Sequence, residues 1–170
     1  METLVLMMVS YKKSKRGNQC KMNYMGLNLC DMANGPGCRV SLFVSGCTLH
    51  CKGCFNRKSW NFNTGLPFTK ETQNKILTAL SNPYISGLSL LGGDPFEPEH
   101  ESTLVNLCKA VKEIQGKTIW IWTGRLYEQV KDKELTKYAD VLIDGPFKKR
   151  FYSKDLEYRG SSNQRIIKLK

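Results

Sequence analysis

The sequence predicts an α/β fold built on a mainly parallel sheet. Short apolar runs typical of strands alternate along the chain with segments of helical periodicity, and this alternation produces right-handed βαβ units whose strands are parallel. At 170 residues the chain has the size of one domain. It is too short for a complete eightfold (β/α) barrel, which takes about 250 residues. Periodicity alone does not distinguish an open sheet from an incomplete barrel.

Five strands are predicted from short apolar or β-branched runs. The first contains Val40, Leu42, Phe43 and Val44, an apolar run whose length is consistent with a buried strand. The predicted strands cover residues 39–45, 87–91, 118–123, 141–143 and 165–169.

Three helices are predicted between these strands. Thr69 is a candidate N-cap for a helix that ends at Ser81, before the Asn82-Pro83 pair. The clearest helix begins near Glu99 and carries apolar residues at spacings of three and four, with Cys108 on its apolar face. A weaker pattern predicts a helix over residues 126–137.

The cysteine-rich stretch from Gly46 to Asn56 is the strongest functional signal. Cys47, Cys51 and Cys54 follow a CxxxCxxC spacing directly after the first predicted strand. Three thiolates in one loop can converge on a metal centre, and a site with three protein ligands keeps a position open for another ligand. A zinc site of three cysteines and His50 is the alternative, although His50 directly precedes Cys51 and adjacent residues rarely bind one ion together.

Further candidate residues follow the other predicted strands. Gly92-Gly93-Asp94 follows the second strand, Thr123-Gly124 the third and Asp144-Gly145 the fourth. The carboxyl ends of parallel strands meet at one edge of the sheet, where α/β proteins build their sites. Glycines at such an edge allow close approach of a ligand, and Asp94 either contributes charge or caps the turn before Pro95.

Charge and cysteine usage narrow the setting. The net charge of +11 is concentrated at the ends, with +4 in residues 1–21 and +6 in residues 146–170. The order of apolar and basic residues at the start is the reverse of a secretory signal, so we expect a cytoplasmic protein, no membrane partner and reduced cysteines. Residues 1–21 lack a packing periodicity, and we expect a disordered or non-native extension before Met22.

Five motifs in order resemble one branch of the radical S-adenosylmethionine enzymes, the activating enzymes of glycyl-radical enzymes. Within that branch the chain is similar to the activating proteins of anaerobic ribonucleoside-triphosphate reductases, over residues 22–169. The motifs are Asn34-Gly35-Pro36-Gly37-x-Arg39, the CxxxCxxC stretch ending in Phe55-Asn56, Gly92-Gly93-Asp94-Pro95, Trp120-Ile121-Trp122-Thr123-Gly124 and Arg159-Gly160-Ser161-Ser162-Asn163-Gln164.

The resemblance implies a partial (β/α) barrel of the radical SAM type over residues 22–170. In it Cys47, Cys51 and Cys54 would hold a [4Fe-4S] cluster. S-adenosyl-L-methionine would bind the open iron and be cleaved reductively, and a hydrogen atom would be abstracted from a glycine of the reductase to leave a glycyl radical. The implied partners are the large subunit of anaerobic ribonucleotide reductase, docked in part by residues 159–164, and a one-electron donor such as flavodoxin. The residues implied to bind S-adenosyl-L-methionine are Gly53, Cys54, Phe55, Gly92, Gly93 and Asp94.

Two other functions remain open from the sequence. A small-molecule radical S-adenosylmethionine enzyme resembling 7-carboxy-7-deazaguanine synthase would carry Gly-Glu-Gly where this chain has Gly35-Pro36-Gly37. A basic zinc-binding nucleic-acid module would explain the charged ends, but it leaves the Gly-Gly-Asp-Pro motif without a role. Direct nucleic-acid binding is therefore disfavoured.

Overall fold

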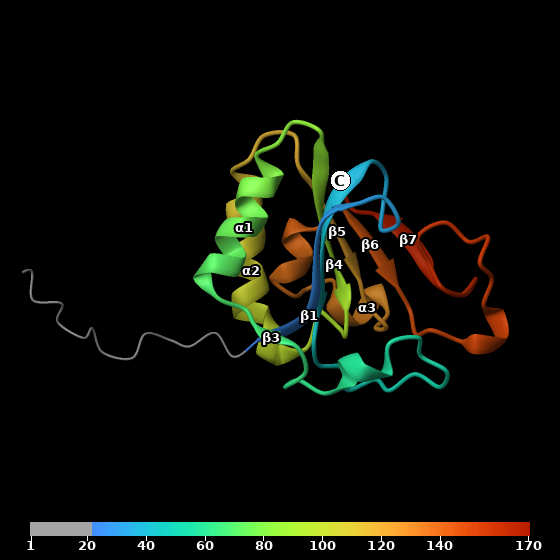
Figure 1. Ribbon diagram of the computed structural model, residues 1–170. Helices are drawn as coiled ribbons and strands as arrows, with labels where there is room; N and C mark the ends of the chain where they lie inside the picture. The colour runs from blue at the N-terminus through green and yellow to red at the C-terminus, as the bar shows by residue number, and fades with distance from the viewer. Residues whose placement is uncertain (1–21) are drawn as a thin grey trace, which may run out of the picture.

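The computed structural model describes residues 22–170 and has the predicted α/β architecture (Figure 1). The expectation for residues 1–21 lies outside the described residues. Seven strands form one sheet in the order β3-β1-β2-β4-β5-β6-β7. The strands are β1 (Asn23–Asp31), β2 (Cys38–Val44), β3 (Leu66–Pro67), β4 (Ile85–Gly92), β5 (Thr118–Trp122), β6 (Val141–Asp144) and β7 (Arg165–Lys168).

The centre of the sheet is parallel and its edges are antiparallel. Strands β2, β4, β5 and β6 pair in parallel, as predicted. Strand β7 pairs antiparallel with β6, while β1 pairs antiparallel with both β2 and β3. The sheet is open, since β3 and β7 are its two edges. Strand β1 was not predicted, because its residues, Asn23 to Asp31, are mostly half-buried or exposed and show no apolar run.

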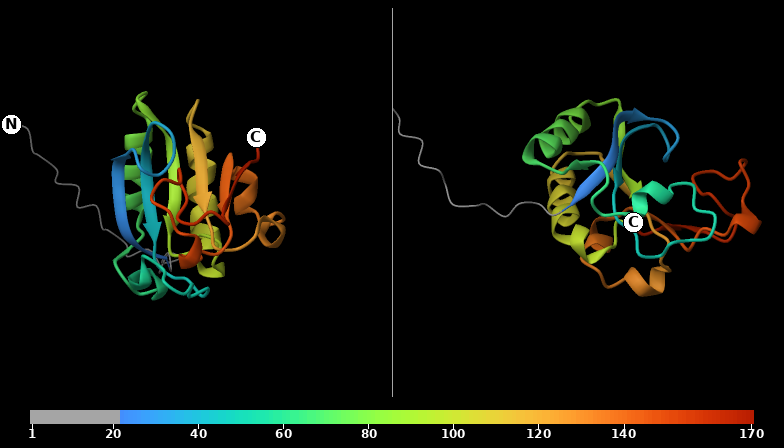
Figure 2. Two further views of the ribbon diagram at one scale, coloured as in Figure 1. Left: turned by 90° about the vertical axis from the view of Figure 1, so that its right-hand side faces the viewer. Right: turned by 60° about the horizontal axis from the view of Figure 1, so that its bottom comes forward.

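Helices α1 (Lys70–Leu80) and α2 (Pro98–Lys112) cover one face of the sheet (Figure 2). The prediction for α1 is confirmed, including the cap, in which Thr69 Oγ1 accepts from the Thr72 N–H. The prediction of one helix over residues 126–137 is wrong. The structure has the single turn α3 (Tyr127–Val130) and the 3-10 turn η2 (Leu135–Tyr138) in its place. There the Thr136 hydroxyl donates to the Val130 carbonyl, which closes a turn in place of a continuous helix.

Alternate residues of the central strands point to opposite faces of the sheet, and side chains on both faces are buried. Val40, Leu42 and Val44 of β2 face the helices and are fully buried, together with Cys108 of α2, as predicted for that thiol. Arg39, on the opposite face, is also fully buried. Its guanidinium donates to Ser89 Oγ, Thr118 Oγ1 and the Leu88 carbonyl at 2.8–2.9 Å, so it joins β2, β4 and β5.

Cys30 and Cys38 form a disulfide, with their Cα atoms 5.3 Å apart. The expectation that the cysteines are all unpaired is therefore wrong for these two. The pairing of β1 with β2 was not predicted, so nothing in the sequence indicated that Cys30 and Cys38 lie side by side. Their loop contains the Asn34-Gly35-Pro36-Gly37 motif, at the opposite end of β2 from Cys47. No helix among residues 22–170 is long and apolar enough to cross a membrane.

Candidate metal centre

The loop that follows β2 folds back on itself and carries the three motif cysteines. The N–H of Gly46 donates to the Ser59 carbonyl at 2.7 Å, and the N–H of Cys47 donates to the Trp60 carbonyl at 3.2 Å. These bonds close the loop next to the 3-10 turn η1 (Arg57–Trp60). A second, tighter turn forms where the Cys54 N–H donates to the Cys51 carbonyl at 3.0 Å.

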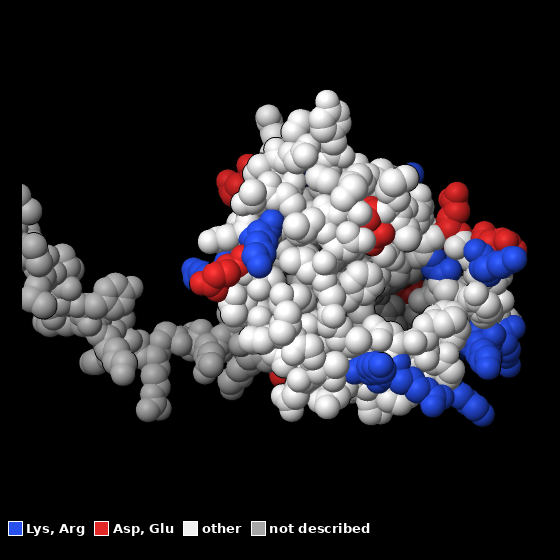
Figure 3. Space-filling model, in the orientation of Figure 1, with Lys and Arg blue, Asp and Glu red and all other residues white. Residues whose placement is uncertain are grey.

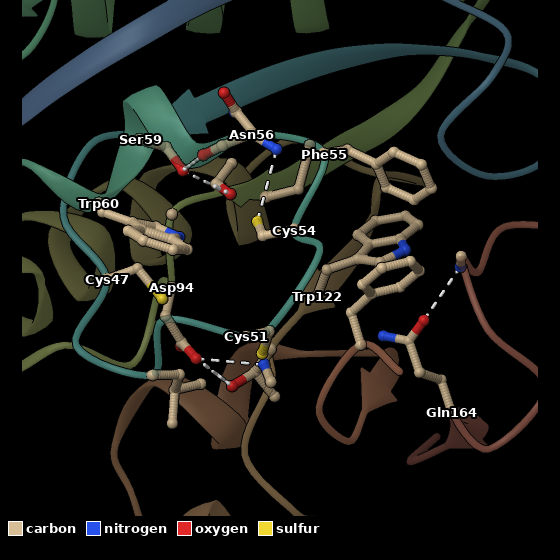
Figure 4. A pocket seen from close by; sticks show the side chains of 18 of the residues that line it. Cys47, Cys51, Cys54, Phe55, Asn56, Ser59, Trp60, Asp94, Trp122 and Gln164 are labelled. Atoms are coloured by element: carbon tan, nitrogen blue, oxygen red, sulfur yellow. Dashed lines mark hydrogen bonds between the residues drawn. The ribbon is translucent and has the colours of Figure 1, made fainter. Parts of the chain in front are cut away.

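Cys47, Cys51 and Cys54 line one pocket of about 230 Å³ at the carboxyl ends of the parallel strands. All three are free cysteines, and Figure 4 shows their sulfur atoms around the same hollow. The pocket brings together the cysteine loop, the ends of β4 and β5, and the segment between β6 and β7. Among its lining residues are Phe55, Gly92, Gly93, Asp94, Trp122, Thr123, Gly124, Gly145 and Gln164.

Burial disfavours the thiolate form of two of the three motif cysteines. Burial raises the pKa of Cys47 to about 11, and burial also raises the pKa of Cys51. As the chain stands, no three His, Cys, Asp or Glu side chains within residues 22–170 are gathered closely enough to hold one metal ion. The donor set still fits an iron–sulfur cluster, because three soft thiolate ligands are available once their protons leave.

His50 does not complete a zinc site in this arrangement. Its ring stacks on Trp60 with the centroids 4.4 Å apart, and it is absent from the lining of the cysteine pocket. Its backbone has a positive φ of 45°, which turns the loop between Leu49 and Cys51. The Cys3His alternative therefore lacks its fourth ligand.

Gly92 and Gly93 lie where the end of β4 presses against the start of the cysteine loop. The Gly93 N–H donates to the Val44 carbonyl at 2.7 Å, and the Asp94 N–H donates to the Gly46 carbonyl at 2.9 Å. A Cβ on Gly93 would lie 2.2 Å from the Gly46 carbonyl oxygen. The glycines are thus required by the protein's own backbone, a reason that the sequence did not reveal.

Asp94 is fully buried and bonded to protein donors. Its carboxylate accepts from the Thr123 hydroxyl at 2.9 Å, from the Gly124 N–H at 3.1 Å and from the Phe96 N–H at 2.9 Å. Burial raises its pKa, while these hydrogen bonds act in the opposite direction. The residue lines the pocket, and it also ties the end of β4 to the end of β5.

Glu97, Arg125 and His100 are functional candidates that the sequence analysis missed. Glu97 Oε1 accepts from the Thr48 N–H and hydroxyl, both at 2.8 Å, and pairs with Arg125 at 3.0 Å. His100 is fully buried between the carbonyl oxygens of Ser45 and Asp94, at 2.7 and 2.9 Å. The signal for Glu97 and His100 in the sequence was their place just after Gly-Gly-Asp-Pro, at the start of α2, whereas Arg125 directly follows the Thr123-Gly124 pair after β5.

The outer rim of the pocket is aromatic. Phe55 is 69% exposed and packs against Phe147 and Tyr152, with ring centroids 4.7 and 5.2 Å apart. Gln164 braces the neighbouring loop, since its Oε1 accepts from the Gly160 and Ser161 N–H groups while its Nε2 donates to the Gly145 carbonyl. The pocket thus opens through an apolar mouth toward solvent.

An α/β domain with three free cysteines at the strand ends has the features of an iron–sulfur protein. The family model described as "4Fe-4S single cluster domain" matches residues 33–167. The chain is 47% identical to the anaerobic ribonucleoside-triphosphate reductase-activating protein of Enterobacteria phage T4, over 85% of this chain and 93% of that one. It is 43% identical to the protein of that name from Vibrio cholerae and 38% identical to that from Escherichia coli K12, over 85% and 88% of this chain and 97% and 100% of theirs.

The chain therefore belongs to the family of anaerobic ribonucleoside-triphosphate reductase-activating proteins. This finding confirms the resemblance drawn from the sequence motifs.

Proposed function

We propose that this protein activates an anaerobic ribonucleotide reductase by radical chemistry at a [4Fe-4S] cluster that Cys47, Cys51 and Cys54 hold. The observation that carries the proposal is the single pocket in which these three free thiols face the ends of β4 and β5. When bound, the cluster and S-adenosyl-L-methionine supply the reductive cleavage that leads to hydrogen abstraction from a glycine of the reductase.

The chain's own residues would bind and orient S-adenosyl-L-methionine beside the cluster. Carbonyl oxygens at Gly92 and Gly93 are hydrogen-bond acceptors suited to an ammonium group. Phe55, together with the backbone at Cys54, would line the adenine side, whereas Gly53, which the sequence also suggested for this role, lines the neighbouring hollow and not this pocket. Asp94 would act chiefly by holding the ends of β4 and β5 together, because its carboxylate is already bonded to Thr123 and Gly124.

The open edges of the sheet are consistent with a protein as the substrate. The sheet would be a partial (β/α) barrel of the radical SAM type, whose uncovered side admits a segment of the reductase. Phe55, which lines the pocket, and Tyr152, which packs against it, have exposed aromatic side chains that are suited to contact such a segment. The electron would come from a one-electron donor such as flavodoxin, in the cytoplasm.

Anaerobic purification followed by iron, sulfide and zinc analysis tests this proposal. We expect iron and labile sulfide in the wild type, and an electron paramagnetic resonance signal of the reduced protein that changes when S-adenosyl-L-methionine is added. Cys47→Ala, Cys51→Ala and Cys54→Ala should each lose the iron. Cys108→Ala is the matched control, since Cys108 is a fully buried residue of α2 and is not among the residues that line the pocket. Stoichiometric zinc without iron would overturn the proposal.

A further inference from the structure

A second hollow, of about 950 Å³, lies beside the cysteine loop and is strongly basic. We call it the basic groove. Its walls are the loop residues 49–53 with Arg57 on one side and residues 146–150 on the other. Figure 3 shows Lys and Arg side chains gathered along this lower right part of the molecule. The basic side chains that line the groove are Lys52, Arg57, Lys148, Lys149 and Arg150.

The positive charge of the basic groove is not neutralised within the described part of the chain. All five Lys and Arg side chains are exposed, and no Asp or Glu is among the groove's lining residues. None of the five belongs to an ion pair formed within residues 22–170. A concave surface lined by one sign of charge focuses its field and attracts partners of the opposite sign.

The basic groove touches the cysteine loop directly. The stem of Lys149 packs over Gly53, where an added Cβ would lie 3.0 Å from the Lys149 Cδ. Cys51 and Phe147 both line the groove, so the groove reaches one of the three motif cysteines. A partner bound in the groove would therefore lie next to Cys51, one of the proposed cluster ligands.

The basic groove and the cysteine pocket share only a narrow border. Leu49, Cys51 and Phe147 line both, whereas Gly92, Gly93 and Asp94 line the pocket alone. Under the proposed function, S-adenosyl-L-methionine and the reductase segment occupy the pocket. With the pocket occupied, an electron would have to reach the cluster from outside the pocket. The basic groove offers such an approach, because it also reaches Cys51.

We propose that the basic groove is the docking surface for the electron donor, a small acidic protein with a low-potential one-electron cofactor. This inference rests on the proposed function. One electron leaves the reduced donor and enters the cluster, so the donor is oxidised by one electron, the cluster is reduced by one electron, and no bond or proton changes in that step. Charge complementarity selects the donor, and the contact at Cys51 and Gly53 gives the short path.

Charge reversal in the groove tests the docking surface. The test variant is Lys148→Glu/Arg150→Glu, and the matched control is Lys70→Glu/Lys75→Glu on the exposed face of α1, which changes the net charge equally. The first readout is the affinity of cluster-loaded protein for flavodoxin at low and high salt. We expect the test variant to bind about tenfold more weakly at low salt and the difference to shrink at high salt.

The second readout is the rate of S-adenosyl-L-methionine cleavage with reduced flavodoxin, divided by the rate with dithionite. This ratio should fall in the test variant and stay unchanged in the control. Equal flavodoxin affinity in both double variants would overturn the docking surface. So would a test variant that binds flavodoxin normally but loses binding of the reductase, since the groove would then serve the protein substrate. Failure of the wild type to cleave with dithionite would instead refute the proposed function.

Discussion

The carboxylate of Glu97 anchors Thr48, the residue directly after the first motif cysteine, through bonds of 2.8 Å to both the backbone N–H and the hydroxyl. Glu97 is almost fully buried and lies just before α2, whereas Thr48 belongs to the cysteine loop. The pair thus links the start of the loop to the scaffold of the sheet. Arg125, after β5, joins the same carboxylate oxygen at 3.0 Å.

Replacing Glu97 should loosen the cysteine loop. We expect Glu97→Ala to lower the free energy of unfolding by about 1–3 kcal/mol, because it leaves a buried donor and Arg125 without their acceptor. Urea unfolding of the metal-free protein measures this loss. Glu97→Gln keeps an acceptor for Thr48 and should lose less. Equal losses in the two variants would show that the hydrogen bonds to Thr48 contribute little.

Arg39 is a buried cation bonded only to neutral oxygen atoms, and burial lowers its pKa to about 10. Arg39→Ala should cost about 3 kcal/mol or more in unfolding free energy, since it removes a large buried side chain and leaves its acceptors on β4 and β5 without their donor. Arg57→Ala is a control at an exposed position and should stay within about 0.5 kcal/mol of the wild type. A small effect at Arg39 would mean that water replaces the guanidinium.

Much of the central fold could be predicted because local patterns and tertiary structure agree there. The Thr69 cap, the apolar face of α2 and the buried run of β2 each carry their own signal. Strand β1 and the disulfide could not be predicted, because they depend on pairing between segments rather than on a local period. The same holds for Glu97 and His100, whose roles arise only when the ends of β2 and β4 meet.

The Cys30–Cys38 disulfide should stabilise the protein only under oxidising conditions. Closing a loop with a sequence separation of eight residues is worth about 2–3 kcal/mol in the chain-entropy model. Cys30→Ser/Cys38→Ser should lose that amount without reductant and nothing in excess dithiothreitol. Alkylation and intact mass before and after reduction check the bond. Two additional free thiols in the protein as isolated without reductant would contradict it.

The lowered pKa of Asp144 makes the stability of the protein depend on pH in acid. Burial raises the pKa of this carboxyl, but hydrogen bonds from Arg165 and from the Tyr127 N–H hold it below its ordinary value. A lowered folded-state pKa gives stability that is present above the unfolded-state pKa and is lost as the pH falls through the folded-state value. Arg165→Gln should therefore move acid unfolding, followed by circular dichroism, to higher pH.

Lys168→Gln is the control for this titration, since it removes the same charge from the exposed side of β7. Its acid-unfolding midpoint should match that of the wild type. A shift as large as that of Arg165→Gln would assign the effect to net charge rather than to the Asp144 pair.

Gly93→Ala should displace the start of the cysteine loop from the end of β4 while leaving every cysteine in place. The added Cβ would meet the Gly46 carbonyl oxygen at 2.2 Å, and neither backbone can move without breaking the bond between the Asp94 N–H and that same carbonyl. We expect a protein that folds with reduced stability and retains less iron after anaerobic reconstitution. Gly116→Ala is the control: its φ is +76°, so it carries backbone strain of about 1 kcal/mol, but nothing lies within 4 Å of its added Cβ. If both variants retain iron equally, the close approach of Gly93 to Gly46 serves folding alone. If only Gly93→Ala loses iron, the glycine pair at the end of β4 positions the loop that we propose holds the cluster.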